Sequence, residues 1–172
     1  MARLPYADWT SPDAAPIAER IQAERGGRML NLYAMLLHSP PLADGWRAFF
    51  TAIRQQCRLP ARYRELAILQ IAVLNRADYE FDAHVPFAVQ AGLAPAQLEA
   101  MRSGLRPADL SAADRAVLDY ATTMTRSVDV PEKLFDSVRA HFDERETVEL
   151  TATIAGYNTV SRFLVALQID HG

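Results

Sequence analysis

The stretch that decides the fold is residues 61–93, ARYRELAILQIAVLNRADYEFDAHVPFAVQAGL. It begins with a nearly all-apolar helical run that carries one carboxylate, Glu65, near its start. A second helical segment follows directly and places Tyr79, Glu80 and His84 within about a turn and a half. Carboxylates and an imidazole on helices with this apolar character indicate acid–base chemistry.

The spacing of these groups predicts how they meet. Glu80 and His84 stand four residues apart, so their side chains share one helical face. A carboxylate beside an imidazole raises the pKa of the ring and keeps a proton donor available near neutral pH. Glu65 lies nineteen residues before His84 and faces it if the two helices form a hairpin around residues 75–78. A surface Glu–His pair with a separate capping glutamate is the alternative, and the residues alone leave both open.

The remaining sequence has helical periodicity throughout, and no segment alternates polar and apolar residues. Ser111 with Asp114 predicts an acidic variant of a capping box, and proline or glycine marks many of the other expected ends. These signals predict an all-α protein. The expected helices cover about residues 13–25, 29–38, 41–57, 61–76, 78–91, 95–103, 111–127, 131–141 and 144–169.

The size and charge of the chain limit the classes of protein to consider. A length of 172 residues predicts a single domain over residues 1–172. The net charge of -3, with no cluster of lysines or arginines, argues against nucleic acid as a partner. The first sixteen residues lack the apolar core of a signal peptide, and no apolar stretch approaches the ~20 residues of a membrane span. We therefore expect a cytoplasmic protein with no membrane partner.

Two segments are apolar nearly all round the helix. In residues 66–74 only Gln70 is strongly polar, and residues 148–167 have few polar interruptions. Helices of this kind lie centrally, enclosed by neighbouring helices or by other subunits. Together with the aromatic run Trp46–Phe50, they predict a homo-oligomer.

A known family has a similar pattern. The sequence Arg-Glu-Leu at 64–66, an apolar helix, Tyr79-Glu80-Phe81-x-x-His84, then Ala88 and Gly92 resembles the core motif of the carboxymuconolactone decarboxylase / alkyl hydroperoxidase D-like family. The likeness is strong over about residues 58–100. Residues 31–40 also resemble the family's lead-in helix, and Tyr157-Asn158 with Arg162 its closing helix. The resemblance implies an alkyl hydroperoxidase D-like helical bundle assembled as a trimer or a hexamer.

The hydroperoxidase branch of this family has a Cys-x-x-Cys pair just before the histidine. Counted back from His84, those positions hold Ala77 and Glu80 in this chain. The one cysteine, Cys57, lies outside the motif. Without thiolates there is neither a nucleophile for peroxide nor a dithiol couple, so an antioxidant hydroperoxidase relative is the disfavoured alternative.

The decarboxylase branch uses no thiols. The resemblance implies cofactor-free loss of carbon dioxide from a small carboxylated lactone or a related intermediate of aromatic catabolism. In this interpretation His84 donates the proton, Glu65 or Glu80 is its partner, and Tyr79 and Arg162 bind the small-molecule substrate. A non-catalytic helical binding or assembly module with the same fold is the alternative outside the enzyme class.

The sequence gives no sign of a metal site or a cofactor. It contains no HExxH motif and no paired Glu-x-x-His motifs, so the two-ligand motifs of known helical metal sites are absent. We therefore expect neither metal nor cofactor.

Overall fold

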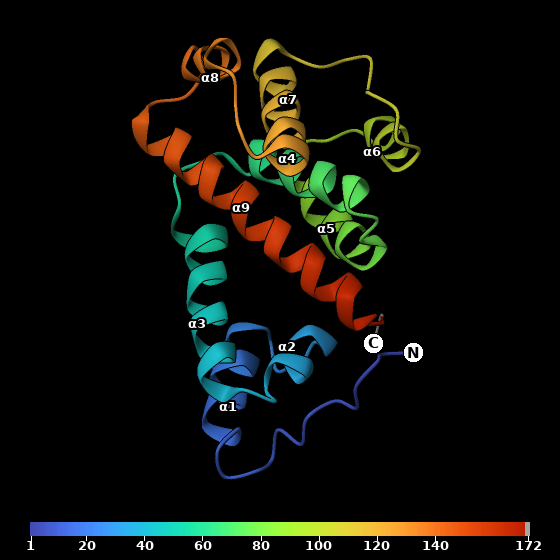
Figure 1. Cartoon of the computed structure of the whole chain (residues 1–172), viewed down its shortest axis with the longest axis vertical. Coiled ribbons are helices and arrows are strands. Elements are labelled where there is room, and N and C mark those ends of the chain that lie inside the picture. The colour runs from blue at the N-terminus through green and yellow to red at the C-terminus, as the bar shows by residue number, and fades with distance from the viewer. Residues whose placement is uncertain (171–172) are drawn as a thin grey trace. The chain divides into compact units, whose positions relative to one another are not determined.

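The computed structural model describes residues 1–170, which form nine α-helices and one π-helical turn and contain no strand (Figure 1). The all-α prediction is confirmed, and each expected helix is present with ends shifted by a few residues. No helix in this described part is long and apolar enough to cross a membrane. The elements are α1 Ala15–Glu24, α2 Asn31–Leu36, α3 Pro40–Thr51, η1 Ala52–Gln56, α4 Ala61–Leu74, α5 Asp78–Gln90, α6 Pro95–Arg102, α7 Ala112–Ser127, α8 Glu132–Arg139 and α9 Glu144–Leu167.

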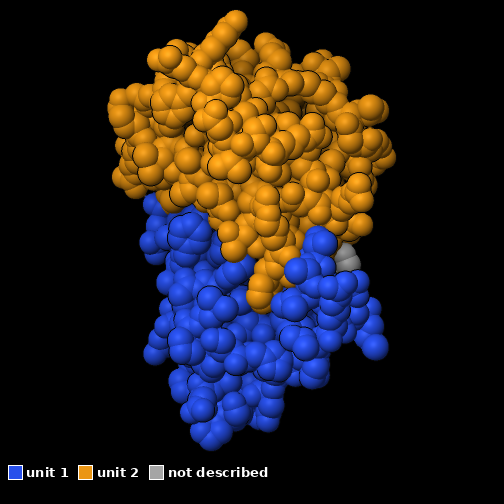
Figure 2. Space-filling view, viewed as in Figure 1, with its two compact units in different colours: residues 1–56, 164–172 blue, residues 57–163 orange. Residues whose placement is uncertain are grey.

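The chain forms two compact units (Figure 2). Unit 1 consists of Met1–Gln56 with Leu164–Gly172, and unit 2 of Cys57–Phe163. The stretch 61–93 therefore lies wholly within unit 2. The interpretation of residues 1–172 as one family domain stays a prediction.

Unit 1 is organised around α3, which packs against both α1 and α2. Phe50 is buried, and the ring of Trp46 lies against it with centroids 5.1 Å apart. Arg47 of the same helix pairs with Asp44 and with Glu24 of α1. The aromatic run 46–50 is thus only partly internal to the unit: Phe50 is buried, whereas Phe49 keeps 46% of its surface exposed.

Unit 2 is built around α4. This helix packs against α5, α6 and α7, and the four consecutive residues Leu66–Leu69 are fully buried. The prediction that this apolar helix is central is confirmed. A helix with apolar side chains nearly all round has no face to give to water, so neighbours cover each side.

Polar contacts fix where α4 begins. Asp114 and Ser111 form the predicted capping box at the start of α7, each side chain bonding the other residue's backbone N–H at 3.0 Å. The same Asp114 carboxylate accepts two hydrogen bonds from Arg62 of α4, at 2.9 and 3.0 Å. The Glu149 carboxylate of α9 accepts hydrogen bonds from the backbone N–H groups of Arg58 and Leu59, at 2.7 and 2.8 Å. The first turn of α4 is therefore held from two sides.

A tight turn connects α4 to α5 and confirms the predicted hairpin. Asn75 ends α4, and Arg76 adopts a left-handed backbone with φ 56°. The side-chain amide of Asn75 donates to Asn158 and Ser161 of α9 at 3.0 and 2.6 Å. These contacts fix the turn, and α5 runs back along α4 from it, with extensive contacts between the two helices.

Candidate active site

Three titratable side chains meet between α4 and α5, inside unit 2. The Nδ1 atom of His84 lies 2.7 Å from Oε2 of Glu65, and its Nε2 atom lies 3.1 Å from Oε1 of Glu80. His84, Glu65 and Glu80 are all buried, with 6%, 2% and 5% of their surfaces exposed, respectively. The predicted meeting of Glu65 with His84 across the hairpin is confirmed, and the alternative of a surface pair is wrong.

The two carboxylates determine the charge of the ring. Burial by itself lowers the pKa of His84, since desolvation disfavours the charged imidazolium. Hydrogen bonds to Glu65 and Glu80, with their negative charges, outweigh this and raise the pKa to about 9. The ring is therefore protonated near neutral pH, donates to Glu65 from Nδ1 and forms an ion pair with Glu80 at Nε2.

Arg64 is a member of the cluster that the sequence did not predict. Its Nε donates to Oε1 of Glu65 at 3.1 Å, so Glu65 binds His84 with one oxygen and Arg64 with the other. With the carboxylates ionised, two cations and two anions balance, which reduces the cost of burying them together. Neighbours in sequence do not share a helical face, so spacing rules gave no reason to select Arg64.

Aromatic rings form two sides of the imidazole environment. The ring of Tyr157, from α9, meets His84 edge to face with centroids 5.2 Å apart. Phe87, one turn further along α5, lies 5.8 Å from the imidazole and keeps 54% of its surface exposed. Neither residue was selected as a site residue from sequence, although Tyr157 belongs to the closing-helix resemblance.

The two residues expected to bind substrate, Tyr79 and Arg162, lie in different surroundings. Tyr79 is half-buried on α5, beside Glu80. Arg162 donates to the backbone oxygen of Asn158 and to its side-chain oxygen, so it joins the polar group at the α4–α5 turn. The structure therefore brings Glu65, Glu80 and His84 together and places Arg162 with Asn158. A substrate contact for either Tyr79 or Arg162 stays a prediction.

The positions that hold thiols in the hydroperoxidase branch are occupied by other groups. Ala77 is buried at the residue preceding α5, and Glu80 places its carboxylate on the histidine. Cys57 is half-buried, and burial, followed by the charge of Glu149, raises the pKa of its thiol. A thiol with a raised pKa contains less of the nucleophilic thiolate at neutral pH.

Histidine and carboxylate side chains such as those of the cluster are also potential metal ligands. Within residues 1–170 no group of three or more His, Cys, Asp or Glu side chains is arranged to hold an ion. Each nitrogen of His84 faces a carboxylate, and a metal ligand would need one of them unprotonated. The expectation of no metal and no cofactor stays a prediction.

Comparison with known proteins places this geometry in a family. The model of the carboxymuconolactone decarboxylase family matches residues 40–123. Among solved structures, an uncharacterized peroxidase-related protein from Silicibacter sp. TM1040 has a TM-score of 0.83 and 22% identity, over 99% of this chain and 90% of that one. No curated protein matches.

Two further structures are similar. A protein of unknown function from Agrobacterium tumefaciens, named for an antioxidant role of the alkyl hydroperoxidase D type, has 25% identity and a TM-score of 0.69, over 78% of this chain and 93% of that one. The debrominase Bmp8 in complex with 2,3,4-tribromopyrrole has 17% identity and a TM-score of 0.79, over 100% of this chain and 94% of that one. Residues 40–123 of this chain thus match the carboxymuconolactone decarboxylase family, and the chain shares the helical fold of the alkyl hydroperoxidase D-like structures.

Proposed function

We propose that this protein is a cofactor-free acid–base enzyme that decarboxylates a small carboxylated lactone or a related unsaturated acid. The observation that carries the proposal is the buried Glu65–His84–Glu80 arrangement, in which the imidazole is protonated near neutral pH. General acids act best when their protonated form is present at the working pH and lies within hydrogen-bond reach of an acceptor.

The chemistry needs a proton at carbon. When the substrate's carboxylate leaves as carbon dioxide, the electrons of the broken carbon–carbon bond move toward the conjugated lactone carbonyl. The resulting dienolate collapses to product when one carbon takes a proton. His84 supplies that proton from Nε2, and the ion pair with Glu65 at Nδ1 holds the ring in orientation.

Oε1 of Glu80 lies 3.1 Å from Nε2 of His84. A carboxyl group takes a proton on one oxygen and releases it from the other, so in this proposal Glu80 relays the His84 proton to the substrate carbon. Arg64 holds the Glu65 carboxylate in place through this transfer, because its Nε donates to the second oxygen. Each group in the relay then has one task.

Thiol peroxidase activity is the alternative raised by the names of the similar structures. It requires redox cysteines beside the histidine, and this chain has Ala77 and Glu80 at those positions. A non-catalytic module would be favoured by Glu80 and His84 side chains open to solvent. Their burial and the raised pKa of His84 favour the enzyme.

The test is decarboxylation of unsaturated γ-lactone acids that carry ¹³C in the carboxyl group. Release of labelled carbon dioxide is followed by NMR, and in D₂O one deuterium should appear at the protonated carbon. We expect His84→Ala, Glu65→Gln and Glu80→Gln each to lower kcat by roughly 10²-fold or more. Combining Glu65→Gln with His84→Ala should lower kcat little further than either single change, since both residues serve one proton transfer.

The matched control is Glu99→Gln, an exposed carboxylate on α6 that lies outside the cluster. It should retain full turnover. Unchanged kcat in both Glu65→Gln and His84→Ala would end the proposal. Release of carbon dioxide without deuterium incorporation would contradict the proton-return step.

A further inference from the structure

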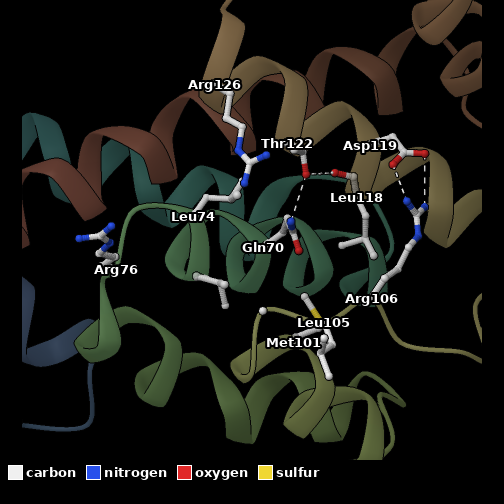
Figure 3. Close-up of a pocket in the computed structure, with 12 residues that line it drawn as sticks. Gln70, Leu74, Arg76, Met101, Leu105, Arg106, Leu118, Asp119, Thr122 and Arg126 are labelled. Atoms are coloured by element: carbon white, nitrogen blue, oxygen red, sulfur yellow. Dashed lines mark hydrogen bonds and ion pairs between the residues drawn. The ribbon is translucent and has the colours of Figure 1, made fainter.

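A separate cavity of about 370 Å³ lies within unit 2, between α4, α6 and α7 (Figure 3). It has the volume of a small-molecule site. Its apolar surface comes from all three elements and includes Val73 and Leu74 of α4, Met101 of α6 and Leu118 of α7. Met101 and Leu118 are buried, so this part of the wall is an extension of the core.

The charges at the cavity differ from those of the whole chain. Three arginines and one aspartate line it, whereas the protein carries a net charge of -3. Arg106 is neutralised, since it pairs with Asp119 at 2.7 Å. Arg76 and Arg126 have no hydrogen-bond or ion-pair partner for their side chains within residues 1–170. Figure 3 shows Arg126 reaching from α7 toward the α4 side, with the Arg106–Asp119 pair at the other end.

Two polar groups complete the wall. The amide nitrogen of Gln70 donates to the Thr122 hydroxyl at 3.0 Å, and that hydroxyl donates to the backbone oxygen of Leu118. The side chains of Gln70 and Thr122 are thereby fixed in position between α4 and α7. Gln70 is the one strongly polar residue of the apolar run 66–74, and this pairing accounts for it.

We propose that this cavity binds a small organic carboxylate, separately from the Glu65–His84–Glu80 site. The apolar body of the ligand packs against Val73, Leu74 and Leu118, and its carboxylate accepts charge-assisted hydrogen bonds from Arg126. Apolar side chains with the unpaired guanidinium of Arg126 beside them match a ligand with the same two parts.

The cavity and the candidate active site lie on different sides of α4. Gln70 follows Glu65 by five residues, which turns about 140° around a helix. Glu65 faces α5, whereas Gln70 faces α7. None of the residues that line the cavity belongs to the proton relay. The inference therefore does not depend on the proposed decarboxylation.

The test uses benzoate as the probe, with neutral benzamide and inorganic phosphate as comparators. Isothermal titration calorimetry on the full chain at pH 7 should show saturable benzoate binding, with benzamide and phosphate at least 10-fold weaker. In methyl NMR spectra, benzoate should shift the signals of Val73, Leu74, Met101 and Leu118. The variant Arg126→Gln should weaken benzoate binding at least 10-fold, because it removes the guanidinium that pairs with the carboxylate.

Arg28→Gln is the matched control, because Arg28 is exposed, has no side-chain partner within residues 1–170 and lies outside the cavity. It should bind benzoate as the wild type does, and so should His84→Ala. If benzamide or phosphate binds as tightly as benzoate, the proposal of an organic carboxylate site is overturned. Failure of benzoate to bind, or loss of its binding in His84→Ala, would overturn it as well.

Discussion

At the scale of single residues, burial determines how strongly Glu65 and Glu80 act on His84. In water, charges a few ångströms apart interact weakly, but the same charges removed from solvent bind strongly. The imidazole has both nitrogens against carboxylates and 6% of its surface exposed, so the protonated form prevails despite desolvation. This makes His84 both a proton donor and a contributor to stability.

The raised pKa of His84 predicts a pH dependence of stability. The value rises from 6.5 to about 9 on folding, so the stabilisation is complete below about pH 6.5 and is lost as the pH rises through about 9. Urea denaturation should show the free energy of unfolding falling over this window, by on the order of 3 kcal/mol. The slope should disappear in His84→Gln and persist in His141→Gln, which changes an exposed histidine. A wild-type stability that is flat from pH 6.5 to 9 would disprove this.

The absence of motif thiols predicts the outcome of a peroxide assay. With Ala77 and Glu80 at the cysteine positions, the protein should not consume hydrogen peroxide or cumene hydroperoxide with dithiothreitol above the uncatalysed rate. The raised pKa of the Cys57 thiol favours the same result. Turnover that Cys57→Ser abolishes would show instead that this thiol is the nucleophile.

At the scale of elements, the position of α4 depends on polar contacts at its first turn. Asp114 serves two elements at once, because it caps α7 and binds Arg62 of α4. Its pKa is lowered, since the hydrogen bonds from Arg62 and Ser111 outweigh the effect of burial. Glu65 lies less than a turn beyond Arg62, so these contacts also position the candidate active site.

Asp114→Asn should therefore destabilise the fold. Loss of the carboxylate leaves Arg62 without its bidentate partner and weakens the capping box, and we expect a cost of roughly 2–4 kcal/mol in the free energy of unfolding. Asp119→Asn on the same helix is the control, because Asp119 also pairs with an arginine but both side chains are about half exposed. The control should cost under about 1 kcal/mol. Equal losses in chemical denaturation would contradict a special role for Asp114.

At the scale of the whole molecule, the chain covers its apolar helices unequally. Helix α4 is enclosed by α5, α6 and α7. Along α9, in contrast, Val148 keeps 67% of its surface exposed, and on α5 Phe87 keeps 54%. Exposed apolar groups of this size are typical of surfaces that other subunits cover.

We therefore expect a homo-oligomer, a trimer or a hexamer built from trimers. Light scattering coupled to size exclusion at micromolar concentration should give three or six times the chain mass of 19.2 kDa. Phe87→Glu should shift the distribution toward smaller species, because a buried unpaired charge is costly. His38→Glu, at an exposed position on unit 1, should not. A monomeric wild type would refute the prediction.

Much of the fold was predictable from local patterns. The hairpin of residues 61–93, the Ser111–Asp114 capping box and the central position of α4 follow from spacing, capping chemistry and the all-round apolar surface. The meeting of Glu65, Glu80 and His84 followed from a four-residue spacing and from the closure of one hairpin. The hairpin and the capping box involve residues close in sequence, and the apolar surface of α4 indicates its burial without naming its neighbours, so sequence rules predict all three.

Only the tertiary structure decided the rest. It showed that Glu80 and His84 are buried, that Arg64 completes the cluster, that Arg162 joins Asn158 and that a cavity opens between α4, α6 and α7. Each depends on which side chains from distant parts of the chain share a space. The sequence by itself determined the helices, the resemblance to the family and the residues that meet at the candidate active site. Packing determined their exposure and partners, because solvation and charge balance depend on all neighbours at once.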